Sequence, residues 1–184
     1  SNGYVYIAGY TRGTMVHAPS CNCGQYNAIV LKLDSSDGSE IWKYQFQADL
    51  YSNTKYNSLA IDNESNIYFV GNVNGGAFTG NSAFGQGDFF LAKLNSSGGE
   101  IYIKKYGTSG GDEAYALTID KNNNIYIAGT NYLQKQGNVH SYNDPDIFLS
   151  KLNTDGTIIW TKQFGTNQGE NPTAIKTDST GNIY

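Results

Sequence analysis

The sequence has a single arginine, three prolines, two cysteines and no long apolar run, and each shortage excludes a class of protein. Arg12 and eleven scattered lysines leave a net charge of −4. No nucleic-acid partner is expected, because a phosphate-binding surface needs concentrated basic side chains. No apolar run reaches the roughly 18 residues of a membrane span, which predicts no membrane insertion. The sequence has no starting Met and no signal-peptide pattern, so we expect a mature or excised segment.

Charge is also scarce, since charged residues make up 15% of the chain and 22 glycines, with Asn, Ser and Thr, carry the polar balance. This composition suits an extracytoplasmic surface, and we expect an extracellular or cell-surface location. Aromatic residues are plentiful, with 15 tyrosines, 8 phenylalanines and 2 tryptophans. Aromatic and β-branched residues favour strands, and their regular clusters argue against disorder.

The two cysteines, Cys21 and Cys23, are separated by one residue. They are interpreted as loop thiols, as a disulfide that is strained because it closes over a single residue, or as half of a metal site. His17 is the one further metal ligand close in sequence. These alternatives stay open, and the pair does not identify a redox compartment.

An internal repeat is the strongest pattern in the chain. Residues 4–9 (YVYIAG), 66–71 (NIYFVG) and 124–129 (NIYIAG) are near copies, and a fourth begins at 181–184 (GNIY). The shared tyrosine falls at positions 6, 68, 126 and 184, which gives intervals of 62, 58 and 58 residues. A fixed period of this length predicts one repeat array over residues 1–184.

Each repeat contains four strand-like runs, which we call A, B, C and D, bounded by Gly, Asn, Asp or Ser. None is long enough for an ordinary helix. Run C always ends in Lys-Leu-Asp or Lys-Leu-Asn. Run A covers 57–62, 115–120 and 173–178, and run B covers the near copies at 4–9, 66–71 and 124–129. Run C covers 28–34, 89–95 and 147–153, and run D covers 41–47, 101–107 and 158–165.

The apolar pattern within the runs predicts how they pack. Runs B and C are apolar at odd and even positions, as in strands buried on both faces. Run D alternates, with Trp42 and Phe46 on one face and polar residues on the other, which is typical of a half-exposed outer strand. The fold class predicted is therefore all-β, a β-propeller built of four-stranded antiparallel blades. Gly9, Gly71 and Gly129, which end run B, are expected where neighbouring groups come close.

The runs follow one another as BCD, ABCD, ABCD and A, which corresponds to about three blades. The predicted blade repeats cover residues 3–62, 65–120 and 123–178, and a further repeat starts at 181–184. Propellers have roughly four to eight blades. The chain is therefore either part of a larger propeller, completed by further blades of the same parent chain, or half of a six-bladed ring formed by a homodimer. The second start of run B favours excision from a longer array, because it would compete with a partner's residues 4–6.

Three stretches carry a resemblance to a known family: residues 88–102 (DFFLAKLNSSGGEIY), 110–115 (GGDEAY) and 119–130 (IDKNNNIYIAGT). The chain resembles the SBBP-type bacterial β-propeller repeat family over essentially its whole length. The resemblance implies a structural repeat of bacterial surface and secreted proteins and implies no activity. The strand order is also similar, more distantly, to that of quinoprotein dehydrogenases, but their quinone-binding residues cannot be placed on this sequence.

The connections between runs differ in how much they vary. The A–B and C–D turns barely change, whereas the B–C segments change completely and the D–A segments vary. In an antiparallel blade the B–C and D–A connections share one edge, which predicts a ligand-binding face there; relaxed constraint on long loops is the alternative. The B–C segments are 12–25, 74–86 and 132–144, and the D–A segments are 48–55, 108–113 and 166–170. The candidate ligand-binding residues are Tyr26, Phe78, Phe84, Tyr132, His140, Tyr142 and Asp144.

The A–B turns place acidic or amide side chains at alternate positions, as at Asp120, Asn122 and Asn124. This spacing is similar to that of a calcium loop, but the twelve-residue loop and final bidentate Glu of an EF-type site are missing. Asp followed by Asn or Gly is also what a short hairpin turn requires. No cofactor and no metal ligand are therefore assigned, and calcium stays the alternative.

The lysines of run C and the two histidines also allow two interpretations. Lys32, Lys93 and Lys151 are expected to extend along the blade and pair with a turn carboxylate or carbonyl, the alternative being a ring of functional cations. His17 and His140 both fall in B–C segments, and no nucleophile or oxyanion donor accompanies them. The sequence therefore predicts that this chain is not an enzyme.

The function expected is that of a non-catalytic extracytoplasmic module, surface-bound or secreted, which acts as a scaffold, in adhesion or in ligand display. Its partner would be a protein or glycan, because exposed aromatics beside amides suit both. The alternatives are a lectin-like propeller with a sugar site in each blade and a fragment of a larger propeller enzyme.

Overall fold

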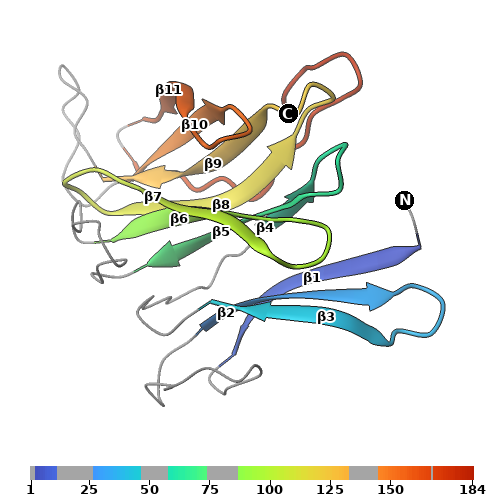
Figure 1. The fold of residues 1–184 in the computed structure, drawn as a ribbon. Helices are drawn as coiled ribbons and strands as arrows, with labels where there is room; N and C mark the ends of the chain where they lie inside the picture. Colours follow the sequence, from blue (N-terminus) through green and yellow to red (C-terminus); the bar gives the residue numbers. More distant parts are fainter. Residues whose placement is uncertain (1–2, 12–26, 47–57, 74–86, 133–144, 167) are drawn as a thin grey trace.

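The computed structural model describes residues 3–11, 27–46, 58–73, 87–132, 145–166 and 168–184. In this part of the chain every regular element is a β-strand, and three antiparallel sheets lie in a stack (Figure 1). The described residues hold no helix, and so none that is long and apolar enough to cross a membrane.

The sheets follow the chain one after another, and neighbouring strands in sequence are neighbours in each sheet. The predicted order BCD, ABCD, ABCD is confirmed, as is the all-β class. The first sheet consists of β1 (Tyr4–Thr11), β2 (Asn27–Asp34) and β3 (Glu40–Gln45). The second consists of β4 (Ser58–Ile61), β5 (Ile67–Val73), β6 (Asp88–Leu94) and β7 (Glu100–Tyr106). The third consists of β8 (Asp112–Ile119), β9 (Ile125–Asn131), β10 (Asp146–Leu152) and β11 (Ile158–Phe164).

The Lys-Leu pair that ends run C marks an irregularity in every sheet. The register between the C and D strands shifts between Lys32 and Leu33, and at residues 93–94 and 151–152 of the other two sheets. A bulge bends the strand and increases its twist. The recurring dipeptide therefore marks where each outer strand turns away from the flat ladder.

The turn before each B strand contains one residue with left-handed backbone. In the second full turn, Asp120 N–H donates to the carbonyl of Asn124 and Asn123 N–H donates to the carbonyl of Asp120, both at 3.0 Å. Closing so short a turn requires a positive φ at its third position, which Gly, Asn and small polar residues tolerate best. The residues at this position are Gly3 (71°), Ser65 (65°), Asn123 (62°) and Gly181 (94°).

Aromatic rings fill the space between the first and second sheets. Phe46, which follows β3, lies 5.2 Å from Phe69 and 5.1 Å from Phe90 between ring centroids. All three side chains are at most 1% exposed. Burying a side chain of this size stabilises the fold by about 1.5–3 kcal/mol, so this contact fixes the two sheets face to face.

The second and third sheets meet in the same way. Phe89 stacks between Tyr106 of its own sheet and Phe148 of the third, with centroid distances of 5.4 Å to each ring. At the inner strands, Asn72 accepts a hydrogen bond from Ala114 N–H at 2.8 Å and donates one to the Ala114 carbonyl at 3.3 Å. Ala114 pairs with Gly129 of β9, and the Asn72 amide bonds its backbone from the second sheet and so joins the two sheets.

The first sheet differs from the others at β1. Every residue of β5 is buried, whereas Val5 and Ile7 of β1 are each 45% exposed. The prediction that run B is buried on both faces is therefore confirmed for β5 and wrong for β1. The physical reason is that Val5 and Ile7 lie on the face opposite Tyr6 and Ala8, which pack against the second sheet, whereas β5 is covered on both faces by neighbouring sheets.

The glycines that end run B show the same difference. A Cβ atom at Gly129 would lie 2.1 Å from the Glu113 carbonyl oxygen and 2.6 Å from the Phe148 ring, so the close approach predicted there is confirmed. At Gly9 the nearest atom, on Ile29, would be 4.0 Å away. Glu113 lies on β8, a run A strand, so the tight contact depends on a strand that the described part of the first sheet does not contain.

Residues 173–178, predicted to form an A strand, make only a bridge between Thr177 and Ile183. The segment nevertheless lies where a fourth sheet would begin. Ile175 and Ile183 pack against Tyr126 and Trp160 on the open face of the third sheet. Lys176 and Tyr184 exchange two backbone hydrogen bonds, and Asp178 N–H donates to the Asn182 carbonyl at 3.0 Å.

Candidate functional site

The stacked sheets have two edges, which we call the turn edge (A–B and C–D connections) and the loop edge (B–C and D–A connections). At the turn edge, the aspartate side chains of the A–B turns accept hydrogen bonds from residues of their own turns. Oδ1 of Asp120 accepts N–H groups from Asn122 at 2.8 Å and Asn124 at 2.9 Å, and Oδ2 accepts the Asn124 amide at 2.7 Å. Burial raises the pKa of Asp120, but these hydrogen bonds and that of Tyr126 outweigh it, and the net shift is downward.

Because these carboxylate oxygens are used by their own turns, the acidic spacing is accounted for by the hairpin geometry. Asp62 repeats the arrangement, accepting N–H groups from Glu64 at 2.9 Å and Asn66 at 2.8 Å. Within the described ranges, His, Cys, Asp and Glu form no group of three that could hold a metal ion.

Aromatic side chains of the D strands donate hydrogen bonds to the turn edge of the following sheet. Trp42 Nε1–H donates to the Ser96 carbonyl at 3.1 Å, and Tyr102 O–H donates to the Thr154 carbonyl at 3.3 Å. Trp42 and Tyr102 occupy the same repeat position, as do Ser96 and Thr154. This hydrogen bond is therefore a repeated contact between sheets, and it fixes how far one sheet is rotated against the next.

The run C lysines lie over the tyrosines of their own sheets. Lys32 Nζ also donates to the Ser96 carbonyl at 3.2 Å, so the prediction of a carbonyl partner is confirmed for this residue. Lys93 Nζ lies 5.0 Å from the ring centroid of Tyr68, and Lys151 Nζ lies 5.5 Å from that of Tyr126. Each cation thus faces an aromatic ring.

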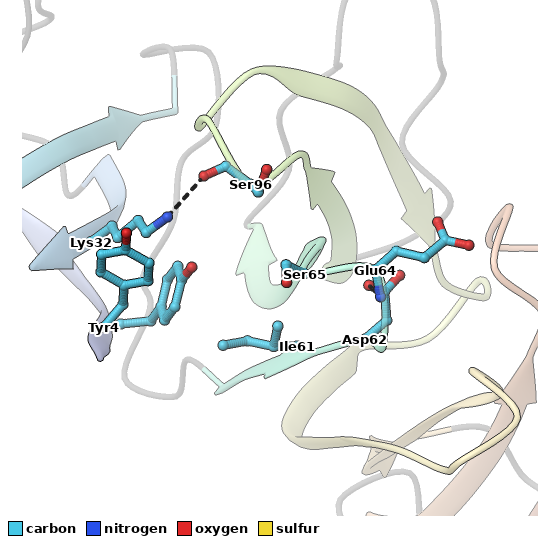
Figure 2. A pocket seen from close by; sticks show the side chains of 8 residues that line it. Tyr4, Lys32, Ile61, Asp62, Glu64, Ser65 and Ser96 are labelled. Atoms are coloured by element: carbon cyan, nitrogen blue, oxygen red, sulfur yellow. Dashed lines mark hydrogen bonds between the residues drawn. The ribbon is translucent and has the colours of Figure 1, made fainter. Parts of the chain in front are cut away.

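A cavity of about 560 Å³ opens at the turn edge between the first and second sheets. One wall carries Tyr4, Tyr6 and Lys32, and the facing wall carries the A–B turn of the second sheet (Figure 2). Lys32 Nζ lies 4.0 Å from the Tyr4 ring centroid and 5.5 Å from that of Tyr6. The remaining lining residues are Ile61, Asp62, Glu64, Ser65 and Ser96.

Sequence reasoning missed this cavity, because it favoured the opposite edge. One signal was present: Tyr4 stands at the position that Asn66, Asn124 and Asn182 occupy in the other repeats. In those repeats the amide closes the turn onto the preceding aspartate, as Asn182 does with Asp178 at 2.7 Å. A tyrosine at this position cannot reproduce the amide contact, so the site differs chemically from the other turns.

At the loop edge the two described D–A turns share one set of hydrogen bonds. Thr108 donates from N–H at 2.7 Å and from its hydroxyl at 2.6 Å to Oδ2 of Asp112. Thr166 donates to Glu170 through the same two groups. Burial raises the pKa of Asp112, more than the Thr108 hydrogen bonds lower it. These D–A turns are thus more alike in structure than their sequences suggested.

A smaller cavity of about 100 Å³ lies beside the Thr108–Asp112 contact, between Tyr106 and Phe148. Of the predicted ligand-binding residues, only Tyr132 is described. It lies at this edge, is 36% exposed, and its N–H donates to the Gly111 carbonyl at 3.0 Å. The other candidates, Tyr26, Phe78, Phe84, His140, Tyr142 and Asp144, lie outside the described residues, as do His17, Cys21 and Cys23.

Stacked antiparallel sheets in A-B-C-D order, joined sheet to sheet by the same aromatic contacts, define the class of protein: this is a partial β-propeller with about three blades. Residues 101–130, which run from β7 to β9, match the SBBP beta-propeller repeat family. The resemblance inferred from the sequence is therefore confirmed in this stretch. A search of curated proteins finds no match to the chain.

Proposed function

We propose that this chain is a non-catalytic propeller module of an extracytoplasmic protein, surface-bound or secreted, which displays a protein- or glycan-binding surface at its loop edge. One observation carries the proposal: the A–B and C–D turns, which share the turn edge, close on themselves in the same way from repeat to repeat. Asp120 and Asn153 illustrate this, since their side chains accept N–H groups of their own turns, from Asn124 and Thr157 respectively.

The B–C segments differ from these turns in both length and sequence. They hold 14, 13 and 13 residues (12–25, 74–86 and 132–144) and share no common motif. A repeat scaffold that is constant at one edge and varied at the other is the arrangement that repeat proteins use for recognition. Tyr132, at the start of one segment, is 36% exposed, and an exposed aromatic ring suits a sugar face or a protein surface.

The experiment is a glycan array probed with the 184-residue chain, its Tyr132→Ala and Tyr142→Ala variants, and Tyr4→Ala as a control. Tyr4 has similar exposure, 40%, but lines the cavity at the turn edge. We expect a glycan signal that the first two variants lose and the control keeps. A signal lost only in Tyr4→Ala would move the site to the turn edge. No signal from the unaltered chain would remove the glycan as ligand and the lectin-like alternative with it.

A further inference from the structure

Two lysines are buried to the same extent but differ in their partners. Lys32 and Lys105 are each 8% exposed. Lys105 forms an ion pair with Asp88 at 2.6 Å. Lys32 Nζ donates to the Ser96 carbonyl at 3.2 Å and faces two tyrosine rings, but it forms no ion pair with a carboxylate of the described residues. Because buried charges are normally paired, the surroundings of Lys32 are incomplete.

The run A aspartates do not provide such an acid in the other sheets. Lys93 and Lys151 hold the position of Lys32 in sheets that include a run A strand, with Asp62 and Asp120 at its end. Within the described ranges neither lysine forms an ion pair. Both are less buried than Lys32, so water solvates their charge. A run A strand is therefore not what pairs with this lysine.

The ammonium of Lys32 lies in the wall of the cavity at the turn edge (Figure 2). The cavity has a volume of about 560 Å³, and ligand pockets span roughly 300–1,000 Å³. It lies on the face of β1 that packs against the second sheet, because Tyr4 and Tyr6 share that face with Ala8. The cavity thus lies between two sheets that the structure describes.

The tyrosine of run B is used differently on the two sides of the second sheet. Tyr68 O–H donates to the Thr154 carbonyl of the third sheet at 3.4 Å. In the first sheet Tyr6 holds this position, but the equivalent carbonyl, that of Ser96, accepts hydrogen bonds from two other side chains, one of them Lys32. The Tyr6 hydroxyl makes no hydrogen bond to a described residue, and it is therefore available to a ligand.

The cavity wall is rich in hydrogen-bond donors. An ammonium has three N–H donors, and the described residues accept a hydrogen bond from one of those of Lys32. A carboxylate ligand matches this wall, because it accepts about four hydrogen bonds and charge-assisted ones are the strongest. The hydroxyls that line the cavity and have no hydrogen-bond partner in the described part of the chain are those of Tyr4, Tyr6, Ser65 and Ser96.

Two acidic residues also line the cavity, but their carboxylates are engaged elsewhere. Oδ1 of Asp62 accepts the N–H of Asn66 at 2.8 Å, and Oδ2 accepts the Asn66 amide at 2.9 Å. Glu64 accepts the same amide at 3.3 Å, and Figure 2 shows its carboxylate directed away from Lys32. The charge at the Lys32 end of the cavity is therefore that of the ammonium.

We propose that this cavity binds a small organic acid, whose carboxylate accepts hydrogen bonds from Lys32 and from the Tyr6 hydroxyl. Tyr4 and Ile61, on facing walls, are 40% and 41% exposed and supply apolar surface for the carbon body of the ligand. An aromatic body is favoured, because it can stack on the Tyr4 ring. The site lies at the opposite edge from the proposed protein- or glycan-binding surface and does not depend on it.

A titration with benzoate tests the charge of the ligand. Benzoate is added to the 184-residue chain, and the chemical shifts of the protein are followed by NMR. Benzamide, which has nearly the same shape without the charge, is the control ligand. We expect the dissociation constant of benzoate to be at least about tenfold lower, since charge-assisted hydrogen bonds are roughly twice as strong as neutral ones. Equal affinities, or no binding of benzoate, would overturn the proposal.

Three variants test the position of the site, and urea denaturation verifies that each is folded. Lys32→Met removes the ammonium and should weaken benzoate binding at least about tenfold. Lys93→Met, at the same repeat position but outside the cavity lining, should leave the affinity unchanged. Tyr6→Phe keeps the ring and should weaken binding about fivefold, and it decides the question if Lys32→Met does not fold. Unchanged affinity in Tyr6→Phe or in folded Lys32→Met, or an equal loss in Lys93→Met, contradicts the assignment.

Two further anions separate the carboxylate from the carbon body. Acetate has the charge without the ring and should bind on the order of tenfold more weakly than benzoate, because it cannot stack on Tyr4. Inorganic phosphate should not displace benzoate at equal concentration. Acetate or phosphate that binds as tightly as benzoate would assign the cavity to small anions in general, and the proposal of an organic acid would then be wrong.

Discussion

The second and third sheets share their strand order and the irregularity between their C and D strands, but the polar groups around one buried aspartate differ. Asp88, the first residue of β6, forms an ion pair with Lys105 at 2.6 Å, and both side chains are fully buried. Asp146 holds the same position in the third sheet, where Gln163 stands in place of Lys105. Gln163 donates to Asn131, and Oδ1 of Asp146 has no hydrogen-bond partner among the described residues.

A second difference concerns the inner strands. Asn72 of the second sheet makes two hydrogen bonds to Ala114, whereas the buried hydroxyl of Thr130, at the same position of the third sheet, finds no partner in the described part of the chain. The residue equivalent to Ala114 in the following repeat is Pro172, which has no N–H to donate. Apolar faces and turns thus determine the common backbone, and the polar contacts that stabilise it vary from sheet to sheet.

The largest effect is expected at the ion pair. Lys105→Gln leaves the carboxylate of Asp88 buried without its cation and should lower the free energy of unfolding by about 3–5 kcal/mol. Urea denaturation of the variant measures this. The double variant Asp88→Asn/Lys105→Gln reproduces Asn27 and Gln45 of the first sheet and should recover most of the loss. A loss below about 1 kcal/mol in the single variant would show that the pair is dispensable.

The inner-strand amide should have the next largest effect. Asn72→Leu removes both hydrogen bonds that the side chain makes to the buried backbone of Ala114 and should cost about 2–3 kcal/mol. Thr130→Val is the matched control, because it removes a hydroxyl that bonds to none of the described residues at the same repeat position. Its effect should stay within about 0.5 kcal/mol or be stabilising. Equal losses in the two variants, measured by the same denaturation, would contradict the comparison.

The smallest effects concern pH, and the two carboxyls should act in opposite directions. The pKa of Asp112 is raised in the fold, so its contribution to stability is full below its unfolded pKa of about 3.9 and is lost as the pH rises through the folded pKa. The pKa of Asp120 is lowered, so its contribution is full above that value and is lost as the pH falls through the folded pKa.

Denaturation from pH 3 to pH 7 separates these cases. Relative to Asp112→Asn, the unaltered chain should lose stability as the pH rises above about 4. Relative to Asp120→Asn, it should lose stability as the pH falls below about 4. Slopes of the same sign would show that one of the two directions is wrong.

The sequence was sufficient for the strand order and the turns, because these depend on local patterns. Trp42 and Phe46 alternate with polar residues and share one face as predicted, which packs against the second sheet. The close approach at Gly129 was also predictable, since a glycine inside an apolar strand often marks a point where another backbone comes near. The match of residues 101–130 to the repeat family confirms the architecture that these patterns indicated.

Contacts between sheets could not be predicted from the sequence. Nothing local pairs Trp42 with Ser96, which lies 54 residues away, or Lys105 with Asp88. The exposure of β1 was also missed, because the residues of run B look the same whether one or both faces of their sheet are covered. The cavity beside Tyr4 and Lys32 is lined by residues of two sheets, so only coordinates reveal it.

The uniform register of the sheets has a consequence for how such a chain can change in length. Among the described residues the second sheet packs against both the first and the third, and Trp42–Ser96 and Tyr102–Thr154 show that successive junctions use equivalent contacts. A duplicated sheet inserted at a junction would contact equivalent surfaces on both of its faces. Folding cooperativity is therefore expected to act between adjacent sheets. Gain or loss of whole units by genetic duplication or deletion would therefore preserve the junctions that remain.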